Sequence, residues 1–145
     1  MNDFEIHLTG PLGAAELLSL RSQLSQWLGG LGAPRDDVYA AVSVLDEMAS
    51  NLMEHSGAQW IELRASAAAG RIQVALRDNG TPFDSAEAAR RDYSDYLNTD
   101  TDRRLGLFLV GRLTDDLRYE REEPRGINCL TFFLKFKGWE APGGA

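Results

Sequence analysis

The segment "RIQVALRDNGTPFD", residues 71–84, decides the fold more than any other part of the chain. Apolar side chains occupy every second position from 72 to 76, which predicts a strand with one buried face. Asp78 continues that buried series, and a carboxylate entering a core is costly unless donors meet it. Asn79 and Gly80 turn the chain, and Gly80 lets a ligand approach the backbone closely. Taken alone, the segment favours an ordinary strand that ends in an Asp-Asn-Gly turn over a ligand site.

Working outward, residues 60–65 alternate in the same way, and the small residues 67–70 predict a hairpin turn into the strand just described. Towards the N-terminus we expect three elements, namely a strand over 4–8, a helix over about 13–28 and a helix over about 34–55. Towards the C-terminus we expect a long polar segment over 81–104, a helix from Gly106 that ends near Asp115–Asp116, strands over 117–121 and 128–136, and a frayed tail from Gly138.

The second predicted helix carries polar residues in an unusual place. Its core stripe is Val38, Ala41, Leu45, Met48 and Leu52. A neighbouring column begins with Ala40 and Val44 but ends with Glu47 and Asn51. A carboxylate and an amide four residues apart share one helix face. They are either exposed surface residues or a site, and we assign His55 a structural role.

Composition bounds the function. The chain has 145 residues with a net charge of -7, and its basic pairs lie among acids, which argues against a nucleic-acid partner. Cys129 is the only cysteine, so an internal disulfide is impossible. Apolar runs are too short for a membrane span, and we expect a cytoplasmic protein. Helices and hairpins in blocks predict an α+β two-layer sandwich, with about three helices on one face of a mixed or antiparallel sheet of about five strands.

The order of these features resembles the Bergerat-fold ATPases, the superfamily of histidine kinase-like ATPase domains (the GHKL group). The resemblance rests on Glu-x-x-x-Asn in a helix, Asp-x-Gly after a strand, and Leu-Gly-Leu opening a helix after a long loop, and it spans about residues 4–136. The chain is most similar to the bacterial anti-sigma-factor serine/threonine kinases. The resemblance implies an ATPase domain over 1–137 with an ATP lid at about 81–105, followed by a flexible tail over 138–145.

The resemblance also implies roles for particular residues. Glu47 corresponds to the general base and Asn51 to the Mg²⁺ ligand at the ATP phosphates. Asp78 corresponds to the acceptor of the adenine amino group, and Gly80 to the glycine on which the base lies. Asn128 stands where the family has a Thr or Ser that helps to bind adenine through water.

The implied phosphate contacts are Arg104, Leu105, Gly106 and Leu107 at the start of the last helix. Here the chain departs from the family, because Arg103 and Arg104 replace glycines. Arginines can donate paired hydrogen bonds to phosphate, but the loss of glycine equally fits weak or absent nucleotide binding.

The implied function is an ATP- and Mg²⁺-dependent serine/threonine protein kinase of the partner-switching type. Its partners would be a sigma factor or similar client and an antagonist protein as substrate, and a homodimer is possible. Two alternatives stay open, a non-catalytic partner-binding module of the same fold and a detached histidine-kinase-type ATPase domain.

Overall fold

The computed structural model describes residues 3–84, 111–136 and 138–142. In chain order the elements are β1 (Asp3–Thr9), α1 (Ala14–Gly30), α2 (Arg35–His55), β2 (Trp60–Ala68), β3 (Arg71–Asp78), β4 (Thr114–Glu122) and β5 (Ile127–Leu134). Residues 111–113 are helical and lead directly into β4. None of the described helices has the length and apolar character that spanning a membrane requires.

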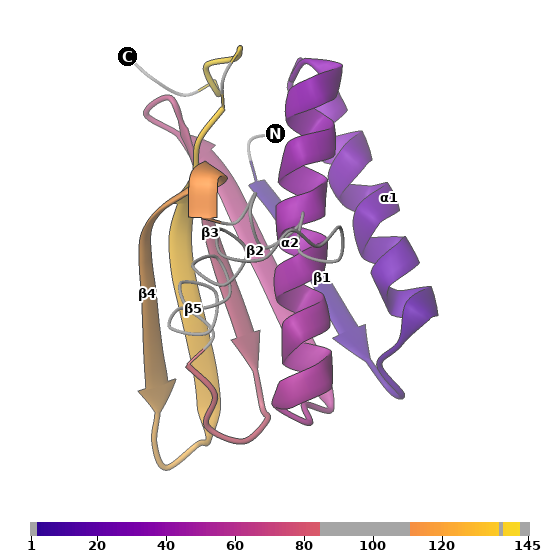
Figure 1. Cartoon of the computed structure of the whole chain (residues 1–145), viewed down its shortest axis with the longest axis vertical. Coiled ribbons are helices and arrows are strands. Elements are labelled where there is room, and N and C mark those ends of the chain that lie inside the picture. Colours follow the sequence, from indigo (N-terminus) through magenta and orange to yellow (C-terminus); the bar gives the residue numbers. More distant parts are fainter. Residues whose placement is uncertain (1–2, 85–110, 137, 143–145) are drawn as a thin grey trace, which may run out of the picture.

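The five strands form one sheet in the order β1-β2-β3-β5-β4. Every pair of neighbouring strands is antiparallel, which decides between the two sheet types that the sequence left open. Figure 1 shows α1 and α2 lying alongside each other against this sheet. The predicted α+β two-layer sandwich is therefore confirmed, and of its expected third helix only the last turn belongs to the described residues.

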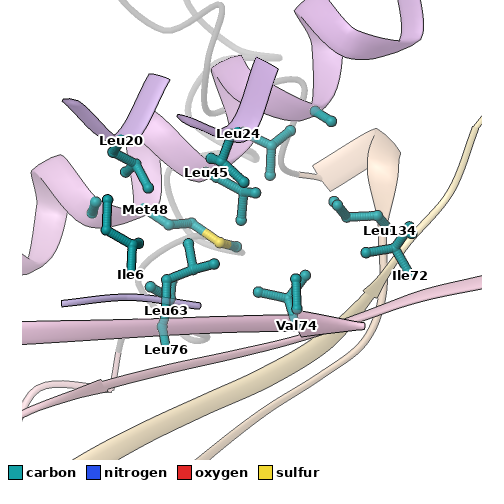
Figure 2. Packing of buried hydrophobic residues seen from close by; sticks show 14 of the residues in the cluster. Ile6, Leu20, Leu24, Leu45, Met48, Leu63, Ile72, Val74, Leu76 and Leu134 are labelled. Carbon is teal, nitrogen blue, oxygen red and sulfur yellow. The ribbon is translucent and has the colours of Figure 1, made fainter. Parts of the chain in front are cut away.

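The core lies between the helix layer and the sheet. Figure 2 shows leucine and methionine side chains of the helices meeting apolar side chains of the strands. The largest of the fully buried side chains is Phe132 on β5, and Leu20, Leu24 and Leu28 line up on α1 at helical spacing. No described helix covers the other face of the sheet. Along each strand, the side chains of this face alternate with those that point into the core.

Helix α2 buries the predicted stripe except at Val38, which is only partly buried. Ala41, Leu45, Met48 and Leu52 are at most 3% exposed. In the neighbouring column Val44 is fully buried, whereas Glu47 and Asn51 are half-buried. The polar end of this column therefore lies at the border of the core and is not a fully solvated face.

The β2–β3 hairpin turns later than predicted. Strand β2 continues to Ala68, which pairs with Arg71, so the turn consists of Ala69 and Gly70 alone. Their φ angles are 54° and 78°, the left-handed values that a two-residue hairpin turn requires. The alanines at 67 and 68 were wrongly assigned to the turn, because small side chains are compatible with strand pairing as well.

The start of β4 was also predicted wrongly. The helix ends at Leu113 and the strand begins at Thr114, whereas we expected the helix to reach about Asp115–Asp116. Thr114 pairs with Leu134, and the register shifts between Asp115 and Arg118. Asp116 has a φ of 55°, so the two acids belong to a bulge inside the strand.

Two other expectations concern the C-terminal tail and the ATP lid. Residues 138–142, part of the expected tail, lie against the domain, with Ala141 4% exposed and the Trp139 ring 4.9 Å from that of Phe136. The expected lid is described only from Thr81 to Asp84, and Arg104, Leu105, Gly106 and Leu107 lie outside the described residues.

Candidate functional site

Asp78 ends β3 and points towards the helix layer. It shares that face with Ile72, Val74 and Leu76, and all four residues are at most 1% exposed. The period-two prediction of an inward carboxylate is confirmed. Burial of a charge in this position demands a physical explanation, because an unpartnered carboxylate in a core costs several kcal/mol.

Two neutral donors meet this carboxylate. The backbone N–H of Gly80 donates to Asp78 Oδ1 at 2.8 Å, and the Asn128 amide donates to the same oxygen at 3.1 Å. Among the described residues, the hydrogen bonds to Asp78 all end on Oδ1, which leaves Oδ2 as an acceptor. This donor set fits a ligand that supplies an N–H group, such as the exocyclic amino group of adenine.

Gly80 is required by packing. A Cβ atom at this position would lie 2.4 Å from the carbonyl oxygen of Ser56 and 2.5 Å from its hydroxyl. The next residue, Thr81, donates its backbone N–H to the same Ser56 carbonyl at 2.8 Å. The turn after Asp78 is therefore seated on the end of α2, and the sequence prediction that Gly80 faces a ligand remains a prediction.

Asn79 ties the turn to the start of β2. Its side-chain oxygen accepts hydrogen bonds from the backbone N–H groups of Gln59 and Trp60 at 2.9 Å and 3.1 Å. Together with the contacts of Ser56, these bonds hold the turn from both sides. Asp78 is consequently carried on a rigid support, which a specific binding site needs.

Helix α2 places Glu47 and Asn51 on one face, in the turns before Ser56. Both side chains are half-buried, so each is partly accessible to a ligand. Ser56 is only five positions after Asn51 in the sequence and is 1% exposed against the turn of Asp78. The structure thus joins the helix that carries the predicted base and metal ligand to the predicted adenine-binding strand end.

The predicted site residues are only partly brought together. Asp78, Gly80 and Asn128 form one connected group, and Asn128 lies opposite Asp78 in the β3–β5 register. His55, which we expected to be structural, lies with its ring 5.4 Å from that of Phe83, just beyond the turn. The four predicted phosphate contacts belong to the part of the chain outside the description.

Three residues of this site were missed by sequence reasoning. Ser56 was assigned only to the end of a helix, and Tyr119 and Arg121 only to a strand. Tyr119 and Arg121 donate to Asn128 Oδ1 at 2.6 Å and 2.9 Å. Their spacing of two on a predicted strand puts them on one face, but nothing in the sequence shows that this face is that of Asn128.

Two solved structures of bacterial proteins have a similar fold. The SiaB–SiaC complex from Pseudomonas aeruginosa matches with a TM-score of 0.63 and 15% identity, over 89% of this chain and 88% of that one. The RsbU and RsbW domains of a Mycobacterium tuberculosis protein match with a TM-score of 0.58 and 20% identity, over 90% of this chain and 32% of that one. At these identities the likeness establishes the fold.

No curated protein sequence matches the chain. The family model of the histidine kinase-like ATPase domain, however, matches residues 11–133, which include Glu47, Asn51, Asp78, Gly80 and Asn128. This match covers most of the chain and agrees with the two-layer fold and the buried aspartate at the strand end. The chain therefore belongs to the histidine kinase-like ATPase domain family.

Proposed function

We propose that the chain binds ATP with Mg²⁺ and acts as a serine/threonine protein kinase of the partner-switching type. The single observation that supports ATP most directly is Asp78, a buried carboxylate that, among the described residues, has neutral donors on Oδ1 and an acceptor left on Oδ2. Adenine supplies the amino group that completes such a site, whereas guanine presents a carbonyl oxygen at that position. Family membership supports the same ligand.

In the proposed reaction Glu47 is the general base. Its carboxylate accepts the proton of a serine or threonine hydroxyl as that oxygen attacks the γ-phosphate and ADP leaves. Asn51, on the same face of α2, supplies a neutral oxygen ligand to the metal. Mg²⁺, when bound, neutralises charge on the phosphates. Arg104, Leu105, Gly106 and Leu107 are proposed to contact the phosphates.

The partners are proposed from chemistry and from relatives. SiaB is found in a complex with SiaC, and the RsbW domain occurs together with an RsbU domain, so both structural relatives are associated with other proteins or domains. We propose that this chain phosphorylates an antagonist protein on serine or threonine and binds a sigma factor or a similar client, with a homodimer as its own assembly. A cytoplasmic location follows from this role.

The kinase proposal is tested by phosphotransfer. Purified chain, ATP, Mg²⁺ and a candidate antagonist protein from the same organism are mixed, and transfer to serine or threonine is measured by mass spectrometry. Replacing the carboxylate in Glu47→Gln is expected to slow transfer about 10²- to 10⁴-fold while ATP affinity stays within about threefold. Tight ATP binding by the wild type without any transfer would remove the kinase and leave an ATPase or binding domain.

One observation favours a second candidate, a non-catalytic partner-binding module. Arg103 and Arg104 stand where the family has glycines at the phosphates. Calorimetry with ATP, ADP and Mg²⁺ separates the two candidates, because the module is expected to bind its partner without binding nucleotide. Restoring glycine at both positions, in R103G/R104G, is then expected to leave the module unchanged but to alter the affinity of a true ATP site.

A further inference from the structure

A polar row crosses three neighbouring strands at the candidate site. Asn128 on β5 lies directly opposite Asp78 on β3 and directly opposite Arg121 on β4. Directly paired residues of a sheet project to the same face, so the three side chains share the helix-side face. Tyr119, two positions before Arg121, projects to this face as well and reaches Asn128 diagonally.

Asn128 is the centre of this row and is fully engaged. Its Oδ1 accepts hydrogen bonds from the Tyr119 hydroxyl at 2.6 Å and from the Arg121 guanidinium at 2.9 Å. Its Nδ2 donates to Asp78 Oδ1 at 3.1 Å and to the Thr81 carbonyl at 2.8 Å. Two donors and two acceptors match the whole capacity of one amide, and Asn128 is only 2% exposed.

The partners allow one orientation of the amide. A guanidinium has only donors, whereas a carboxylate and a backbone carbonyl have only acceptors. Turning the Asn128 amide over would place its NH₂ group against Arg121 and its oxygen against Asp78 and Thr81, so three hydrogen bonds would become repulsive contacts. The Tyr119 hydroxyl can donate or accept, and it therefore strengthens the orientation without deciding it.

Arg121 is itself held in place. Its Nε donates to Glu123 Oε1 at 2.6 Å, and its Nη1 also donates to the Gly80 carbonyl at 3.1 Å. The guanidinium thus spans from β4 to the turn that follows Asp78. Side-chain exposure of 20% leaves it mostly shielded from water, so these bonds are not readily exchanged for solvent.

We infer that Arg121 and Tyr119 are positioning residues that fix the Asn128 amide and thereby set the nucleobase specificity of Asp78, an inference that rests on the proposed ATP binding. With the amide fixed, Asp78 Oδ1 is saturated by donors and the carboxylate presents Oδ2 as an oriented acceptor. Adenine offers an amino group to that acceptor. Hypoxanthine offers a carbonyl oxygen there, which the carboxylate repels.

The test compares ATP with ITP, in which a carbonyl oxygen replaces the 6-amino group of adenine and the neighbouring ring nitrogen N1 carries a proton. Arg121→Met keeps an unbranched apolar stem but removes every donor, and it is expected to weaken ATP binding about tenfold, the effect of one charged hydrogen bond, while ITP binding changes less than about twofold. Arg121→Lys keeps a donor and is expected to restore most of the ATP-over-ITP ratio. Tyr119→Phe is expected to lower the ratio about threefold.

The matched control is Arg118→Met on the same strand, where the side chain is 69% exposed and pairs with Asp116. It is expected to leave the ratio unchanged. Dissociation constants are measured by calorimetry with Mg²⁺ present, and thermal melting checks that each variant is folded. Equal loss of ATP and ITP binding, or an unchanged ratio in the folded Arg121→Met and Tyr119→Phe variants, would overturn the positioning role alone. A wild-type chain that binds neither nucleotide would overturn the proposed function together with it.

Discussion

The two faces of the sheet each bury one carboxylate, and they satisfy it in opposite ways. Asp78 on the helix side is 1% exposed and is met by two neutral donors on one oxygen. Glu62 lies on the open face of the sheet, the face that no described helix covers. It is 5% exposed and is surrounded by basic groups, with His7 at 2.7 Å, Arg64 at 3.3 Å and Arg77 at 3.5 Å. The two lie next to each other in the register, because Ile61 pairs with Asp78 and Glu62 with Arg77.

This difference distinguishes Glu62, a carboxylate with a structural role, from Asp78, a carboxylate of a candidate binding site. Three cationic or polar partners complete Glu62, so its surroundings leave little for a ligand to add. Asp78 has no such compensation among the described residues, and its neutral donors leave acceptor capacity on Oδ2. Burial alone would have ranked the two carboxylates as equals, whereas the charge and the number of their donors distinguish them.

The strongest test of this difference is nucleotide affinity in Asp78→Asn. The amide keeps an oxygen for Gly80 and Asn128, but it presents NH₂ where Oδ2 was, so ATP binding is expected to fall about 10- to 100-fold. Calorimetry measures the loss, with Glu62→Gln as the matched control on the other face. Equal weakening by both variants would mean that Asp78 is no more specific to the site than Glu62.

Next in size is the packing of the turn that carries Asp78. A methyl group in Gly80→Ala meets the Ser56 carbonyl, a backbone atom that cannot swing away, so the free energy of unfolding is expected to fall by about 1–3 kcal/mol. Urea denaturation measures it. Gly29→Ala is the control, because nothing lies within 4 Å of its added Cβ.

The cause of that loss can be separated further. Combining Gly80→Ala with Ser56→Gly removes the hydroxyl but keeps the Ser56 carbonyl oxygen, which is the nearest atom at 2.4 Å. Stability is therefore expected to stay low in the double variant. Full recovery of stability would mean that the clash is with the Ser56 side chain and that the contact with its backbone carbonyl contributes little.

A feature of the fold or of the candidate site can be predicted from the sequence when neighbouring residues define it, and cannot when residues far apart in the chain define it. The strand of Asp78 and the stripe of α2 follow from periods of two and 3.6, which are local. Contact between Gly80 and Ser56, and between Asn128 and Arg121, depends on strand order and register, which no local pattern contains.

The bulge in β4 shows the same limit from another side. The pair Asp115 and Asp116 suggested the end of a helix, because Asp is common in the turns that follow helices. Their place inside a strand is set by the pairing of Thr114 with Leu134, on a segment far along the chain. Within the candidate site, the sequence therefore predicted Asp78, Gly80 and Asn128 but neither Tyr119 nor Arg121.

A smaller effect is expected on the open face. Glu62→Gln deprives two arginines and a histidine of a buried partner, and the free energy of unfolding is expected to fall by about 1 kcal/mol. The value is modest because Arg64 and His7 are more than half exposed and can turn towards water. Asp78→Asn, which removes a buried charge without a cation, is expected to change stability less or to raise it. Urea denaturation of the two variants side by side measures the contrast, and a larger loss in Asp78→Asn would contradict it.

The finest test uses Cys129 as a reporter of the open face. Burial raises the pKa of its thiol, the charge of Arg77 opposes that rise, and the charges of Glu120, Glu122 and Glu62 add to it. Since the thiolate is the reactive form, alkylation is expected to be slower than for a free cysteine and to accelerate as the pH passes the raised pKa. A raised pKa also means that the thiol stabilises the fold below the unfolded-state pKa and that this contribution is lost as the pH rises through the folded value.

Iodoacetamide rates between about pH 7 and about pH 10 measure this pKa on the only thiol of the chain. Glu62→Gln removes a charge that raises the pKa of Cys129, so the midpoint is expected to move to lower pH, whereas Arg77→Gln is expected to move it higher. Asp78→Asn lies on the other face and is expected to leave it in place. A shift in Asp78→Asn as large as that in Glu62→Gln would show that the sheet does not separate the two charge environments. The contrast between its two faces would then not hold for the pKa of Cys129.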